Sequence, residues 1–91
     1  MDNPEFEIQK ALGTVETFCV VAQTRTPYEC HSVYEVNAVD EAHAIQRCKA
    51  YMAEATPQYD WLISTLEWQA GKQFNALSCE RANKTVIKVP D

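Results

Sequence analysis

The hydrophobic and polar positions of residues 32–52 change period once, and this change predicts a strand that continues directly into a helix. Apolar and polar residues alternate over 33–38, with Tyr34, Val36 and Ala38 on one face and Glu35 and Asn37 on the other. After residue 41 the apolar spacing becomes helical. The predicted apolar stripe of this helix comprises Ala42, Ile45, Cys48, Met52 and Ala55, while Glu41, Arg47, Lys49 and Glu54 mostly face water.

Capping residues mark the ends of two predicted helices. Asp40 can accept hydrogen bonds from the first turn of the long helix, and Thr56-Pro57 ends it because proline disfavours helical geometry in the residue before it. A shorter helix over 4–12 is framed by Asn3, Pro4 and Gly13. Because so short a helix is marginal alone, it has to dock, and the candidate docking residues are Phe6, Ile8 and Leu12.

The remaining apolar segments predict a sheet. Residues 17–23 form a nearly continuous apolar run, typical of a central strand with both faces covered, one of them by the N-terminal helix. This strand and 33–38 form a hairpin around Pro27. Residues 61–68 alternate, 69–72 form a turn, 74–79 return as a strand and 85–89 form a short final strand.

The predicted fold is therefore α+β, in the order α-β-β-α-β-β-(β). An antiparallel sheet of four to five strands carries one long helix packed on a face and a short N-terminal helix. The 91 residues are expected to form a single domain over 1–91.

Apolar runs and cysteine usage indicate the compartment. No segment approaches the roughly 20 apolar residues of a membrane span, and the N-terminus is acidic where a signal peptide is basic and then apolar. We therefore expect no membrane partner and a cytoplasmic location, in which the four cysteines stay reduced. Three of them, Cys19, Cys48 and Cys79, occupy positions that pattern as core.

The net charge of −5 is unevenly distributed. Residues 1–60 carry ten acids and four bases, whereas 61–91 carry three acids and four bases. This balance disfavours binding to free nucleic acid, which requires a basic footprint, and favours a basic partner protein. The plainer interpretation is that the charge serves only solubility.

The pattern of potential catalytic and metal-binding residues does not indicate an enzyme. Cys30 and His31 are adjacent, so their side chains diverge on an extended backbone, and His43 falls on the polar side of the long helix. Two glycines in the whole chain leave no phosphate-binding loop. We expect no catalytic residue, cofactor or metal. A small enzyme or metal domain using Cys30, His31 and His43 stays as the third hypothesis.

Nucleic-acid contact is the second hypothesis. Trp61, Trp68 and Phe74 lie in neighbouring segments, but Asp60 and Glu67 beside them oppose an RNA-binding sheet surface. A basic cluster near the C-terminus could instead serve a small nucleic-acid-contacting regulatory domain, with candidate contacts at Lys72, Arg81 and Lys84.

In its short length, acidic balance, lack of a catalytic motif and strand-into-helix segment YEVNAVDEAHAIQRC, the chain resembles small phage and mobile-element accessory proteins of the anti-CRISPR type. The resemblance implies an inhibitor that binds a CRISPR-Cas effector complex in the host bacterial cytoplasm. Such an inhibitor blocks target-DNA binding or nuclease recruitment.

Loop aromatics and acids are the natural contact residues for such a partner. Core packing accounts for Trp61 as well as an interface does, so Tyr28 is the predicted interface aromatic. The predicted partner-binding residues are Tyr28, Glu29, Glu35, Asn37 and Glu41.

Overall fold

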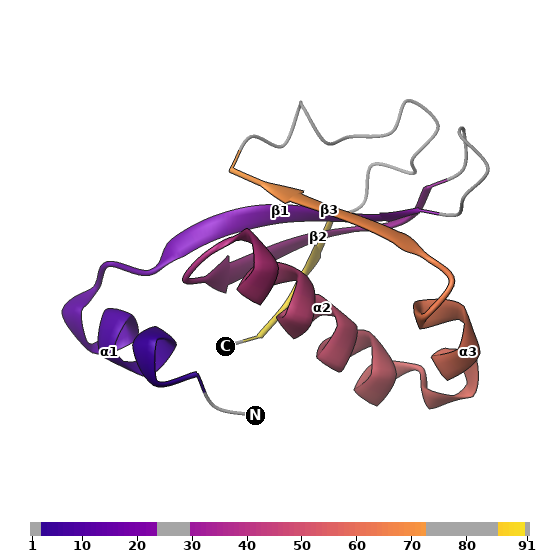
Figure 1. The fold of residues 1–91 in the computed structure, drawn as a ribbon, viewed down its shortest axis with the longest axis horizontal. Coiled ribbons are helices and arrows are strands. Elements are labelled where there is room, and N and C mark those ends of the chain that lie inside the picture. Colours follow the sequence, from indigo (N-terminus) through magenta and orange to yellow (C-terminus); the bar gives the residue numbers. More distant parts are fainter. Residues whose placement is uncertain (1–2, 24–29, 73–85, 91) are drawn as a thin grey trace.

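A computed structural model describes residues 3–23, 30–72 and 86–90 and shows one long helix lying across a face of a sheet (Figure 1). The α+β class predicted from the sequence is confirmed. In chain order the described elements are α1 (Pro4–Leu12), β1 (Glu16–Gln23), β2 (Cys30–Ala38), α2 (Glu41–Ala55), the 3-10 turn η1 (Pro57–Tyr59), α3 (Asp60–Ile63), β3 (Glu67–Gly71) and β4 (Val86–Lys88).

The four strands pair in the order β3-β1-β2-β4. β1 and β2 form the predicted antiparallel hairpin, with Cys19 opposite Glu35 and Val21 opposite Val33. β1 also pairs antiparallel with β3, whereas β4 runs parallel to β2. The sheet is therefore mixed, and not wholly antiparallel as predicted.

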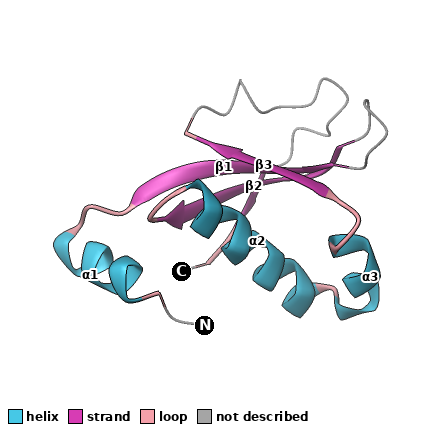
Figure 2. Cartoon of the chain, in the orientation of Figure 1, coloured by secondary structure: helices cyan, strands magenta, loops and turns pink. Residues whose placement is uncertain are grey.

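The strand directions explain why α2 covers the sheet. β2 and β3 lie on either side of β1 and both run antiparallel to it, so they point the same way. A chain that leaves β2 and enters β3 in the same direction has to cross a face of the sheet, and a helix is the usual crossover. This crossing carries α2 over β1 (Figure 2).

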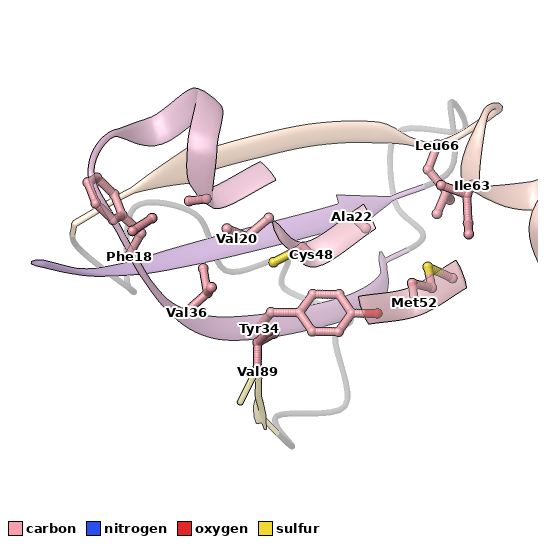
Figure 3. Packing of buried hydrophobic residues seen from close by; sticks show 12 residues of the cluster. Phe18, Val20, Ala22, Tyr34, Val36, Cys48, Met52, Ile63, Leu66 and Val89 are labelled. Atoms are coloured by element: carbon pink, nitrogen blue, oxygen red, sulfur yellow. The ribbon is translucent and has the colours of Figure 1, made fainter. Parts of the chain in front are cut away.

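The core lies between α2 and the sheet face below it. β1 contributes Phe18, Val20 and Ala22, and alternate residues of β2 meet them, as the period of two predicts. Figure 3 shows the sulfur of Cys48 within this layer and Ile63 with Leu66 at one end of it. The other buried residues of the cluster are Tyr34, Val36, Ala38, Ala44, Met52 and Val89.

The opposite face of the sheet is also withdrawn from solvent. Cys19, Val21 and Val33 point away from α2 by alternation, yet their exposed fractions are 6%, 1% and 2%. β1 is therefore buried on both faces, as its continuous apolar sequence predicts.

The predicted covering of β1 by the N-terminal helix is wrong. α1 lies beyond the end of the sheet (Figure 1) and docks on α2, where the Phe6 ring meets His43 edge-on at 5.0 Å. Of the three candidate docking residues only Phe6 is buried, while Ile8 and Leu12 are 59% and 70% exposed.

The predicted caps are confirmed. The Asn3 side chain accepts from the N–H groups of Glu5 and Phe6, and Gly13 ends α1 in the left-handed conformation at a φ of 72°. Asp40 Oδ1 accepts from the His43 N–H at 2.7 Å. α2 then ends at Ala55, before the predicted breaker.

Two predictions about local structure are wrong. The buried positions of α2 are His43, Ala44, Cys48 and Met52, while Ala42 and Ala55 at the ends of the predicted stripe are exposed. Residues 61–68 do not form one strand, because they contain most of α3, a turn and the start of β3. β3 continues to Gly71 and so includes most of the predicted 69–72 turn. Ile63 and Leu66, three residues apart, both reach the core, so helical spacing prevails over the apparent alternation. The predicted strand 74–79 lies outside the described residues.

Candidate interaction surface

In the described residues the acidic side chains are exposed, whereas most of the lysine and arginine side chains contact other groups of the chain. All nine acidic residues in the described part of the chain are exposed, namely Glu5, Glu7, Glu16, Glu35, Asp40, Glu41, Glu54, Asp60 and Glu67. The ammonium of Lys72 lies 2.9 Å from the Glu16 carboxylate. Lys49 lies 5.7 Å from the Trp68 ring centroid. The net field of this surface is therefore negative.

A groove of about 320 Å³ lies where the outer face of the sheet, turned away from α2, becomes exposed near residues 17–19 of β1. Its lining residues are Thr17, Phe18, Cys19, Glu35, Lys72 and Val86. Burial and the nearby Glu35 carboxylate raise the pKa of the Cys19 thiol, which therefore stays neutral. An exposed carboxylate beside apolar walls suits a lysine or arginine side chain, whose stem is apolar and whose head is charged.

The predicted partner-binding residues are only partly brought together. Glu35 and Asn37 alternate onto the same outer face of β2, whereas Glu41 is exposed in the first turn of α2. The Asn37 side chain accepts a 2.7 Å hydrogen bond from the Thr17 hydroxyl, so it contributes to pairing of β1 and β2. Tyr28 and Glu29 lie outside the described residues.

Of the predicted nucleic-acid contacts, only Lys72 lies in the described part of the chain. Its ion pair with Glu16 offsets the positive charge that a phosphate would need. Arg81 and Lys84 lie outside the described residues.

Trp61 is an exposed aromatic residue, although its sequence pattern fits core packing and an interface equally well. It stands 65% exposed on α3. A helical interpretation of residues 60–66 would have found it, because residue 61 lies about 200° around the helix axis from residue 63, which faces the core. Misassignment of 61–68 as a strand concealed this position.

A second groove, of about 350 Å³, follows the flank of α2 beside the C-terminal segment, and its lining includes His43, Arg47, Tyr51, Glu54 and Pro90. The prediction that His43 faces solvent is wrong. Its side chain is buried, and its Nδ1 accepts from the Val39 N–H at 3.1 Å. Burial and the adjacent Arg47 lower the pKa of His43, because both disfavour the imidazolium. His43 therefore belongs to the packing of α1 on α2.

The cysteines that the structure describes as free, Cys19 and Cys48, are both buried, as predicted. Cys79 lies outside the described residues. Within the described ranges, no three histidine, cysteine or acidic side chains are grouped so as to hold a metal ion.

No protein-family model, curated protein or solved structure matches this chain. Among the helices of the described residues, none has the length and apolar character needed to cross a membrane.

Proposed function

We propose that this chain is a protein-binding inhibitor that docks through its acidic surface on a basic, nucleic-acid-binding surface of a larger complex. The observation that supports it is that all nine carboxylates of the described residues are exposed, while cations such as Lys72 and Lys49 contact the chain's own groups. The partner we propose is a bacterial CRISPR-Cas effector complex in the host cytoplasm, following the resemblance to anti-CRISPR proteins.

The electrostatics favour competition with DNA. A channel that binds DNA presents lysine and arginine to phosphates, and a compact surface rich in carboxylates can take the place of those phosphates. Opposite charge speeds the encounter, whereas groups held in a groove slow dissociation. Glu35 is the acid that lines the outer groove, so it is the residue we assign to a specific contact.

The test is binding of labelled target DNA to a panel of purified effector complexes, followed by fluorescence anisotropy as the chain is added. We expect loss of DNA binding at one chain per site on a susceptible complex, and weaker inhibition as salt rises. Glu35→Gln should weaken inhibition about tenfold. Glu7→Gln is the matched control, because it removes an exposed carboxylate of α1 that does not line the groove, and it should change inhibition much less.

Retention of DNA by every complex in the panel would contradict the CRISPR assignment. Direct, steeply salt-dependent binding of the chain to free DNA or RNA would instead support the nucleic-acid-contacting alternative.

A further inference from the structure

The packing of α3 leaves Trp61 facing solvent. α3 is a single turn whose Ile63 side chain, together with Leu66 just beyond it, enters the core next to Met52 (Figure 3). The backbone therefore turns the indole, on the opposite side of the same turn, outward, with 65% of its surface exposed. A side chain with this much apolar area is a frequent hot spot of protein interfaces.

The segment of the chain that contains Trp61 carries only acidic side-chain charges. Residues 50–71 contain three acids, Glu54, Asp60 and Glu67, and no lysine or arginine. All three acids are exposed. α2 packs against η1 and α3. Its last turn contains no basic residue. Its C-terminal carbonyl groups add negative potential to that of the carboxylates.

We propose that Trp61 is the anchor for an arginine side chain on the basic partner, an inference that rests on the proposed function and names its contact. A guanidinium stacks flat on an indole face and is attracted by its π electrons, and its N–H groups can donate to a nearby carboxylate, for which the exposed neighbour Asp60 is the candidate. A lysine ammonium has the same charge but no plane to stack. The Trp61 surface, defined as Trp61 with its neighbour Asp60 on α3, therefore prefers arginine to lysine.

The probes are two synthetic peptides of equal length and charge, one carrying arginine and the other lysine at every basic position. Each is titrated at low salt into the full chain labelled with ¹⁵N, and the indole N–H signals of Trp61 and Trp68 are followed. The Trp61→Phe spectrum assigns the two signals. We expect the Trp61 signal to move and the arginine peptide to bind more tightly than the lysine peptide.

Trp61→Ala should weaken binding of the arginine peptide about two- to fivefold, so that it binds no more tightly than the lysine peptide. Ile8→Ala is the matched control, since it removes a similarly exposed apolar side chain from α1 and should alter neither affinity. Unchanged amide spectra of both variants establish that the fold is retained.

Two results would overturn the proposal. If both peptides bind but the Trp61 signal stays in place, or Trp61→Ala keeps the arginine preference, the anchor is wrong and the acidic binding surface stands. If neither peptide binds the wild-type chain at low salt, the proposed function is wrong together with the anchor.

Discussion

The guanidinium of Arg47 lies 4.6 Å from the centroid of the Phe6 ring. The same guanidinium donates hydrogen bonds to the backbone carbonyls of Asn37 and Pro90. One side chain of α2 thus joins the N-terminal helix, the end of β2 and the C-terminal segment. An arginine suits this place because its planar fork can stack on a ring and donate from its edge at the same time.

Phe6→Ala should release α1 from α2. Phe6 is the one buried side chain of α1 and is 6% exposed, so we expect a loss of about 3 kcal/mol in the free energy of unfolding. Urea denaturation measures it. Leu12→Ala, at a position 70% exposed, is the control and should stay within about 0.5 kcal/mol of wild type. Equal losses in the two variants would show that α1 does not dock through Phe6.

Arg47→Lys keeps the positive charge but removes the planar guanidinium with its several N–H donors. A single ammonium cannot reach two carbonyl groups and cover the Phe6 ring, so we expect a loss of about 1–2 kcal/mol in unfolding free energy. Amide hydrogen exchange should be faster at Val89, whose N–H bonds to the Glu35 carbonyl beside this junction. Lys88→Arg, the reciprocal exchange at an exposed position, should change neither quantity. Wild-type protection of Val89 in Arg47→Lys would contradict the role of the guanidinium.

The lowered pKa of His43 predicts a loss of stability in mild acid. The ordinary pKa is 6.5, so below that pH the unfolded chain takes up a proton that the folded chain resists. Stability linked to His43 is therefore complete above about pH 6.5, falls as pH decreases, and levels off below the folded pKa. Protonation of Nδ1 would also break the hydrogen bond from the Val39 N–H, because both groups would then be donors.

The matched comparison for this pH effect is His43→Asn, whose side-chain oxygen can accept from the Val39 N–H and does not titrate. Denaturant unfolding of both proteins between pH 7.5 and 5 should show a steeper decline for wild type. His31 and the carboxylates are common to both proteins, so parallel curves would refute the assignment to His43.

Cys48 should resist thiol reagents while the chain is folded. Burial raises the pKa of this thiol to about 12, and the thiolate is the reactive form. We expect iodoacetamide to label Cys48 in urea and to leave it unmodified in buffer, as read by peptide mass spectrometry. Rapid labelling in buffer would contradict its burial.

Replacement of Cys48 tests the same environment. Cys48→Ala should cost about 1 kcal/mol through the small cavity it leaves, whereas Cys48→Ser should cost more because a hydroxyl is buried in an apolar layer. The opposite order in urea denaturation would indicate a polar partner for this position.

Local signals in the sequence were sufficient for the ends of the helices and for the hairpin. Asn3, Gly13 and Asp40 bond to backbone groups two to four residues away, so their effect can be predicted before any packing is known. The alternation in β2 likewise predicts which face carries Tyr34 and which carries Glu35, because the strand period is a property of the backbone.

Such local signals do not predict which helix residues are buried. The sequence predicts an exposed, polar His43, but α1 places Phe6 against it. Trp61 is predicted to lie in a strand, but it belongs to α3, which directs Ile63 into the core. The predicted contact residue Glu35 could be placed on the outer face of β2, but the groove beside it requires β1 and β4 as well.

The α+β class, the capped helices and the doubly buried β1 therefore follow from the sequence alone, because caps, alternation and continuous apolar runs are patterns of a few neighbouring residues. The parallel pairing of β4 with β2, the docking of α1 on α2 and the exposure of Trp61 beside Asp60 emerge only from the packed fold. These features depend on contacts between segments far apart in the chain, and no local pattern encodes which segment will cover a given side chain.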